Sequence, residues 1–362
     1  MEKNSKQIIK VLTESPGISG FEKPVREKIV EYLSPLSCEI QTDNLGSLIV
    51  SKQRKDDSPK IMMVSHMDEV GFMVTRITDD GFIKFQPIGG WWGQVLLSQK
   101  VEILTSTSKI LGVIGAKSPH ILTTEEMKQP VKISSMFIDI GAASKEEVEK
   151  TGIKVGDPIT PYSEFEMCTN NKSFMSKALD DRIGCAMIIE IFQELNNYNY
   201  PGTIFGVLTV QEEVGLRGAA TSVSVVKPDI AIILDVTVAT DTPNISDTDV
   251  ITKTFIGKGP IVGFYDASMI PHIPFRNLVT ETALEHNIPF QIEIMREGGT
   301  DAGKIHVFCQ GVPSIVIGIP VRYIHGHIGI AHMDDYHQAI KLVLALIKKL
   351  DVNVMKKLKD EN

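Results

Sequence analysis

The sequence lacks the features of a secreted, disulfide-bonded or membrane-spanning protein. Its four cysteines (Cys38, Cys168, Cys185 and Cys309) are scattered and form no Cys-x-x-Cys pair, which is typical of a reducing compartment. Residues 1–15 lack the apolar core of about 7–15 residues that marks a signal peptide. No stretch approaches the roughly 20 apolar residues that span a bilayer. We therefore expect a cytoplasmic protein with no membrane partner.

A basic surface and two common hydrolase motifs are also missing. The 362 residues carry a net charge of −8 and no face-length cluster of Lys and Arg, so no nucleic-acid partner is expected. The absence of Gly-x-Ser-x-Gly excludes a serine hydrolase with a nucleophile elbow. The absence of His-Glu-x-x-His excludes a single-zinc protease of that type.

The chain does contain enough apolar sequence for two domains. Hydrophobic residues make up 43% and charged residues 23% of a chain that is longer than most single cores. Residues 1–36 predict two helices around a PGISGFE turn, and 39–65 predict two strands joined by a charged loop. From about residue 165, helices and strands alternate up to a long helix at 336–350.

The pattern changes between these parts. Short alternating strands are separated there by DDG, GG and TSTS turn signals, with little helical periodicity. This pattern is typical of a small β-barrel-like domain. The sequence therefore predicts an α/β catalytic domain, residues 1–71 and 163–362, interrupted by an inserted β domain, residues 72–162.

Four apolar runs each end at residue types that bind divalent metals. They are residues 61–65 before His66, 203–210 before Glu212 and Glu213, 230–234 before Asp235, and 314–319, which His325 follows within six residues. Short apolar runs rich in Ile and Val predict strands that are buried on both faces. Ligands of open α/β sheets bind outside the carboxyl ends of the strands, so we expect these side chains to converge.

The residues available at these strand ends suit a metal-dependent hydrolase. The possible ligands are His66, Asp68, Asp180, Asp181, Glu212, Glu213, Asp235 and His325. Nitrogen and oxygen ligands without cysteine favour zinc, cobalt or manganese. The set is large enough for two ions if one carboxylate bridges them, and hydrolysis needs one further carboxylate as a base.

Several of these residues also have an ordinary structural interpretation. His66 and Asp68 could form a simple hydrogen-bonded pair, and Asp180–Asp181 could cap a helix at 182–195. Adjacent acids such as Glu212 and Glu213 would repel each other unless a cation lay between them. His327 and His332 are close enough to compete with His325 for its role.

Six strings carry a more specific signal. They are HMDEVG (66–71), ALDDRIG (178–184), QEEVGLRGA (211–219), LDV (234–236), GGTDAG (298–303) and RYIHGH (322–327). In this order they resemble the cytosolic dinuclear-metal aminopeptidases, a family that includes glutamyl aminopeptidase and the tetrahedral aminopeptidases. The resemblance covers nearly the whole chain and implies hydrolysis of amino-terminal residues from peptides.

The resemblance also implies a role for each matching residue. Two divalent metal ions per subunit, zinc or cobalt with manganese as an alternative, would share Asp180; one would take His66 and Asp235, the other Glu213 and His325. Glu212 matches the general base, Asp68 the acid that orients the histidine, and Thr300 and Asp301 match substrate contacts. Gly326 stands where relatives usually have serine, which removes a hydroxyl but no ligand.

The implied fold is a mixed sheet flanked by helices, with the β-barrel-like insertion after the first metal histidine. Members of the family self-associate through the insertion, commonly as dodecamers around an internal chamber. Trp91–Trp92 could belong either to such an interface or to the core of the β domain. A glycoside hydrolase that uses the paired carboxylates is the alternative function.

Overall fold

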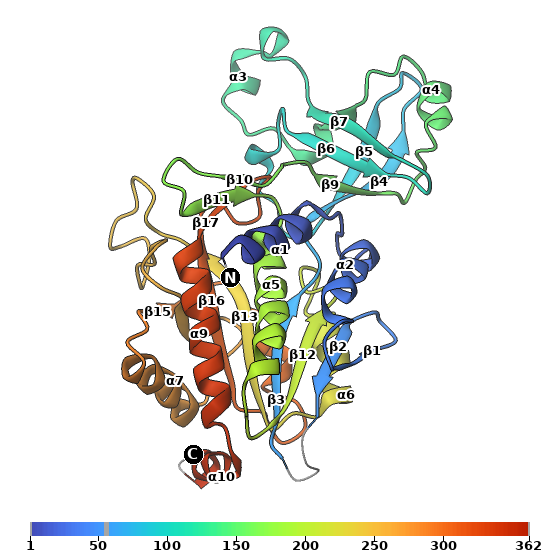
Figure 1. Ribbon diagram of the computed structural model, residues 1–362. Coiled ribbons are helices and arrows are strands. Elements are labelled where there is room, and N and C mark those ends of the chain that lie inside the picture. Colours follow the sequence, from blue (N-terminus) through green and yellow to red (C-terminus); the bar gives the residue numbers. More distant parts are fainter. Residues whose placement is uncertain (1, 54–57, 361–362) are drawn as a thin grey trace.

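The computed structural model describes residues 2–53 and 58–360, which form a helix-flanked sheet with a β-barrel beyond one end of it (Figure 1). The main sheet has eight strands in the order β1-β2-β12-β3-β13-β16-β14-β15. In that order the strands are Glu39–Thr42, Leu48–Lys52, Thr203–Thr209, Lys60–His66, Ile230–Val238, Ser314–Val321, Ile261–Tyr265 and Gln291–Ile294. The sheet is mixed, because β1, β2 and β14 pair antiparallel with their inner neighbours.

The four apolar runs predicted from the sequence are the four adjacent central strands. β12, β3, β13 and β16 all run parallel. Thr209 pairs with His66, and Asp235 pairs with Gly318, so the runs end at the same edge of the sheet. The expected convergence of their carboxyl ends is therefore present.

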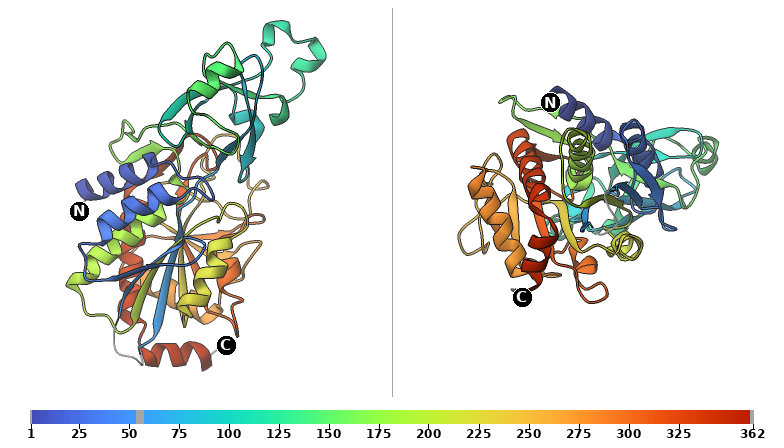
Figure 2. Two further views of the ribbon diagram at one scale, coloured as in Figure 1. Left: turned by 90° about the vertical axis from the view of Figure 1, so that its right-hand side faces the viewer. Right: turned by 60° about the horizontal axis from the view of Figure 1, so that its bottom comes forward.

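Helices cover both faces of this sheet (Figure 2). On one side lie α1 (Glu2–Glu14), α2 (Lys23–Leu33), α5 (Leu179–Glu194), α7 (Ile273–Glu285) and α9 (Met333–Lys349); α6 (Arg217–Val226) and α8 (Ala302–Ile305) lie on the other. Ile61 and Met63 of β3 point to the first side, whereas Met62 and Val64 point to the second. Alternate residues of a buried strand face opposite layers, which explains the continuous apolar run. Among the described residues, no helix is long and apolar enough to cross a membrane.

The insertion is a closed barrel. Its strands follow the order β4-β5-β8-β7-β6-β9: Gly71–Ile77, Ile83–Ile88, Phe137–Asp139, Lys109–Gly115, Lys100–Leu104 and Pro158–Pro161. Pairing of Phe72 with Ile159 closes the ring. The barrel encloses its own apolar core, including Phe72, Ile103 and Ile138, and carries the short helices α3 (Thr124–Met127) and α4 (Lys145–Lys150). The predicted α/β fold with an inserted β-barrel is confirmed.

One local prediction was wrong, and another was correct except for its boundaries. The first of the two strands expected over 39–65 is divided into β1 and β2, because Asp43 Oδ1 accepts from the backbone amides of Leu45, Gly46 and Ser47 and holds a turn. The charged loop that follows includes residues 54–57, which lie outside the described residues. The helix expected at 336–350 begins earlier, at Met333, and α10 (Val352–Asp360) follows it. The small sheet β10 (Glu166–Met167), β11 (Ser173–Ser176) and β17 (Gly329–His332) lies between the main sheet and the barrel.

A buried ion network fixes the point where the chain leaves the sheet for the barrel. Glu69, in the connection between β3 and β4, accepts from Lys177 Nζ at 2.6 and 2.7 Å and from the backbone amide of Gly17 at 3.2 Å. Arg182 of α5 approaches the same carboxylate at 3.4 Å and donates to the carbonyls of Met67 and Gly17. These contacts tie three distant segments to one short connection.

We expect Glu69→Gln to lower the free energy of unfolding by about 3–5 kcal/mol, because it leaves the buried Lys177 and Arg182 without their counter-charge. Urea unfolding of the purified protein measures this. Glu31→Gln is the matched control, since Glu31 pairs with Lys28 on the exposed surface of α2, and it should cost less than about 1 kcal/mol. Equal, small effects of both variants would contradict a structural role for the network.

Candidate metal centre

The ends of the central strands bring together most of the predicted ligands. His66 ends β3, Asp235 lies in β13, Glu213 follows β12 and His325 follows β16. Asp180 joins them from the start of α5. Potential ligand atoms of His66, Asp180 and Glu213 all lie within 4.8 Å of one another, as do those of His66, Asp181 and Asp235.

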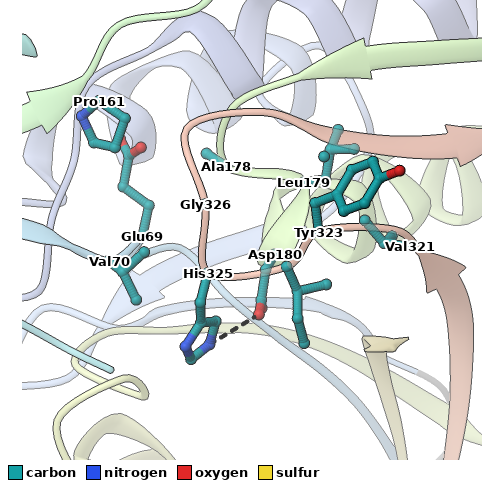
Figure 3. A pocket seen from close by; sticks show the side chains of 12 residues that line it. Glu69, Val70, Pro161, Ala178, Leu179, Asp180, Val321, Tyr323, His325 and Gly326 are labelled. Atoms are coloured by element: carbon teal, nitrogen blue, oxygen red, sulfur yellow. Dashed lines mark ion pairs between the residues drawn. The ribbon is translucent and has the colours of Figure 1, made fainter. Parts of the chain in front are cut away.

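Asp180 lies between two histidines. Its Oδ1 is 2.9 Å from His66 Nε2. Its Oδ2 is 3.4 Å from His325 Nε2, the contact drawn as a dashed line in Figure 3. On the first side Asp235 Oδ1 is 4.0 Å from His66 Nε2, and on the second Glu213 Oε2 is 3.4 Å from His325 Nε2. The two oxygens of one carboxylate thus face two separate groups of ligand atoms.

The second nitrogen of each histidine is held by a backbone carbonyl. His66 Nδ1 donates to the carbonyl of Asp68 at 3.0 Å, and His325 Nδ1 donates to the carbonyl of Gly90 at 2.9 Å. A carbonyl only accepts, so each Nδ1 carries hydrogen and each Nε2 points toward Asp180. This is the arrangement in which proteins commonly orient imidazoles that bind metals.

The carboxylate of Asp68 is placed differently from the role that the resemblance implies. It is 3.6 Å from His66 Nδ1, farther than the backbone carbonyl of the same residue. Its closest partners are the Ser19 hydroxyl at 2.6 Å and the backbone amides of Glu212 and Glu213 at 3.0 and 3.2 Å. Asp68 therefore fixes the loop that carries the two glutamates as well as lying beside His66.

Asp181 has a different role from its neighbour. Asp180 and Asp181 have non-helical backbone angles, so regular helix begins only after them. Asp181 accepts from the amide of Gly184 at 3.1 Å, which caps this helix, and from the Ser65 hydroxyl at 2.6 Å. One acid of the pair thus caps α5, and the other faces the histidines.

The carboxylates of this cluster are unfavourable in their ionised form, because they are buried and lie close to one another. Burial and the nearby Asp180 raise the pKa of Glu213 to about 8, and they raise that of Asp235 to about 8 as well. Burial lowers the pKa of His325, but the contacts with Asp180 and Glu213 outweigh it and bring the value to about 9. Glu213 Oε1 is buried without a hydrogen-bond partner. The raised pKa values of Glu213 and Asp235 mean that their ionised forms are unfavourable without a nearby positive charge, which a cation at this position would supply.

Glu212 and the predicted substrate contacts lie close to the same charges. Burial, with the carboxylates of Asp301, Asp235 and Glu213, raises the pKa of Glu212 well above 4.5. Asp301 is buried and accepts from the Thr209 hydroxyl, while its Oδ1 has no partner. Thr300 is also buried and accepts from the amide of Ala302. The structure therefore places these two residues beneath the site rather than on an open surface.

The competing histidines do not join the ligands. His332 caps α9 by accepting from the amide of Asp334. His327 is buried, neither of its ring nitrogens has a hydrogen-bond partner, and burial lowers its pKa to about 4. The Gly90 carbonyl could not be predicted as a partner of His325 from the sequence, because every residue carries a backbone carbonyl.

The fold and the site together define an α/β protein that is interrupted by a β-barrel and has a histidine–carboxylate centre that could hold metal. The sequence matches the family model described as M42 glutamyl aminopeptidase over residues 46–342. The chain belongs to this family, which confirms the resemblance seen in its motifs, and it is a hydrolase that acts as an aminopeptidase.

Named relatives cover almost the full chain. A glutamyl aminopeptidase of Lactococcus lactis is 36% identical, over 97% of this chain and 98% of its own. A lysyl aminopeptidase of Pyrococcus furiosus is 35% identical, over 95% and 97%.

Solved structures agree with the fold. The TET aminopeptidase of the marine sediment archaeon Thaumarchaeota archaeon SCGC AB-539-E09 has a TM-score of 0.95 at 44% identity, over 99% of both chains. The Pyrococcus horikoshii TET1 peptidase, which can assemble into a tetrahedron or a large octahedral shell, has a TM-score of 0.85 at 32% identity, over 96% and 100%. A Thermotoga maritima structure described as an endoglucanase is more distant, with a TM-score of 0.77 at 30% identity, over 97% and 99%.

We expect a divalent cation to displace more than one proton per chain at pH 7. The pKa values near 8 for Glu213 and Asp235, and near 9 for His325, lie above that pH, so these groups hold protons that the cation must remove. Calorimetric titration of metal-stripped protein, in buffers of different ionisation enthalpy, measures the release. Because the groups lose their protons as pH rises through 8 to 9, release should decline and apparent affinity should increase. Binding without proton release at pH 7 would refute this account of the cluster.

Proposed function

We propose that this aminopeptidase holds two divalent cations, one on each side of Asp180, and hydrolyses the first peptide bond of peptides with Glu212 as the base. The observation that carries the proposal is the position of Asp180 between two ligand groups. Its Oδ1 faces the side of His66 and Asp235, and its Oδ2 faces the side of His325 and Glu213. A carboxylate shared in this way would serve as a ligand for both ions.

The donor set fits such ions. Imidazole nitrogens and carboxylate oxygens without cysteine suit zinc or cobalt, with manganese as an alternative. The buried, unpartnered Glu213 Oε1 and the raised pKa values of Glu213 and Asp235 both favour a cation at this position. When bound, the ions would supply polarisation of the scissile carbonyl and a water whose pKa falls to about 7.

The protein's own groups then manage the proton. Glu212 accepts a proton from the attacking water and donates it to the leaving nitrogen. The carbon–nitrogen bond therefore breaks to release a neutral amine rather than an amine anion. Burial raises the pKa of Glu212, which favours its holding the proton between the two transfers. Asp68 supports the step by binding the backbone amides of Glu212 and Glu213, which directs the adjacent side chains to different tasks.

Substrate enters from the side of His325. The side chain of His325 is 38% exposed and that of Asp180 16%, whereas that of His66 is 3% exposed. A small pocket beside Asp180 and His325 is lined by Tyr323 and by Pro161 of the barrel (Figure 3). We assign Thr300 and Asp301 to substrate binding, as the match of the GGTDAG loop implies. Relatives of similar identity are named for glutamyl and for lysyl residues, so loops around a common centre would set the preference.

The glycoside hydrolase alternative is not favoured. A metal-free glycosidase needs two carboxylates, and it would have no use for two histidines whose Nε2 atoms both face Asp180.

We place the enzyme in the cytoplasm, since all four of its cysteines are free and none approaches another in a disulfide.

Replacing each of the adjacent glutamates by glutamine tests the proposal. Glu212→Gln should keep two ions and lose about 10²–10⁴-fold in turnover of aminoacyl chromogenic substrates, because it removes only the base. Glu213→Gln, the matched control, should lose metal and recover activity partly with excess ion. Elemental analysis gives the metal content. Near wild-type turnover of Glu212→Gln with both ions bound, or activity of the stripped wild type, would overturn the mechanism.

The barrel has a role distinct from catalysis. We propose that residues 1–71 and 163–362 form the catalytic domain, and that residues 72–162 serve oligomerisation and act as a lid. Exposed apolar side chains on the insertion, among them Leu111, Ile121 and Met127, support an interface there.

Light scattering should therefore find a closed particle rather than a single chain. A tetrahedral shell of identical chains, like the one that the Pyrococcus horikoshii peptidase can form, needs about twelve copies. Charged substitutions at the exposed Ile121 and Met127 should yield smaller species. A monomeric wild type at micromolar concentration with full peptidase activity would refute the assembly.

A further inference from the structure

One segment of the barrel reaches the candidate metal centre. Residues 89–92, with the sequence GGWW, connect β5 to the short helix η1 (Gly93–Val95). Within it, the Gly90 carbonyl accepts the hydrogen bond of His325 Nδ1 at 2.9 Å. The other histidine of the centre, His66, is held instead by Asp68 next to it in the chain. The two sides of Asp180 are thus supported by different parts of the molecule.

Two glycines let the backbone of this segment lie close to His325 and Glu213. A Cβ on Gly90 would lie 3.2 Å from His325 Nδ1 and 3.5 Å from its Cε1. A Cβ on Gly89 would lie 2.7 Å from a methyl of Val70 and 3.4 Å from the Cβ of Glu213. The two glycines therefore let the segment pack directly against His325 and Glu213, the ligands on one side of Asp180.

Trp91 fixes the segment in this position. Its indole Nε1 donates to the carbonyl of Gly71 at 3.0 Å, where the chain enters the barrel. Its ring stacks on Phe72 with centroids 4.7 Å apart and planes at 23°, and its other neighbour is His327, with centroids 5.5 Å apart. Trp92, by contrast, is 64% exposed. The two tryptophans that the sequence could not separate have different environments, and only Trp91 joins the barrel core to the loop of His325.

We propose that Trp91 is a positioning residue of the metal centre. By fixing residues 89–92 it holds the Gly90 carbonyl against His325, which keeps Nε2 directed toward Asp180 and Glu213. The inference rests on the proposed function, because it takes His325 and Glu213 as ligands of one ion. It follows that the barrel controls the ion on this side, whereas the ion beside His66 and Asp235 depends on the catalytic part alone.

Three single substitutions in the full-length protein separate these contributions. Trp91→Phe keeps a ring on Phe72 but removes the indole donor to Gly71. Gly90→Ala adds one methyl group against His325 and costs little in backbone conformation, since the φ of Gly90 is not left-handed. Trp92→Phe is the matched control on the neighbouring, exposed residue.

The measurement is the number of ions retained per chain after dialysis against a graded chelator. Partners that orient metal-binding histidines typically contribute about 10–100-fold to metal affinity. We expect Trp91→Phe and Gly90→Ala to release one ion at about tenfold lower chelator concentration and to retain the other as the wild type does. Trp92→Phe should follow the wild-type curve. The metal concentration for half-maximal activity should rise in the same two variants, while kcat at saturating metal stays within about threefold.

A purely structural role would give a different result. In that case, the unfolding temperature of the metal-stripped Trp91→Phe variant would be lower than that of the metal-stripped wild type, but its metal retention against chelator would be unchanged. This result would overturn the inference. Unchanged retention in Gly90→Ala would overturn it independently, even if Trp91→Phe failed to fold. If the wild type retained no ion, the proposed function itself would be refuted. Failure of the inference about Trp91 can therefore be distinguished from failure of the proposed function.

Discussion

The accumulation of buried negative charge beside His66 is the constraint on which this structure depends. Asp180, Glu213 and Asp235 come from three different elements and are drawn to one point although their charges repel. No apolar packing could hold them there as bare anions, because a buried charge must be paired or neutralised. His66 and His325, whose Nε2 atoms both face Asp180, provide part of this pairing. The same positions give the site its capacity for cations.

A short connection carries much of the supporting structure. Residues 67–70 join the end of β3 to the start of the barrel, and their two acidic residues bind different parts of the chain. Asp68 binds the amides of Glu212 and Glu213, and Glu69 binds Lys177 and Arg182 at the start of α5. The connection therefore sets the relative positions of the glutamate loop, the helix that presents Asp180, and the inserted barrel. Buried, fully paired networks of this kind fix one arrangement.

The insertion and the sheet share the centre unequally. The sheet, the loops that follow its strands and the start of α5 provide every side chain proposed as a ligand. The barrel provides one carbonyl and a wall of the pocket. A domain that only assembles subunits would not need to approach His325. Its contact with His325 means that the geometry of the site depends on the position of the barrel relative to the sheet.

The sequence by itself determined the central strands and the residues at their ends, because strands covered on both faces must be continuously apolar and the polar residue that follows marks the edge. It also determined the β insertion, through alternation and turn signals. Only the tertiary structure decided which strands are neighbours, that Asp181 caps α5 while Asp180 faces the histidines, that Trp91 is packed and Trp92 exposed, and that Gly90 supports His325. Residue type records hydrophobicity and charge along the chain. The direction of a side chain and the position of a backbone carbonyl arise only when distant segments pack together.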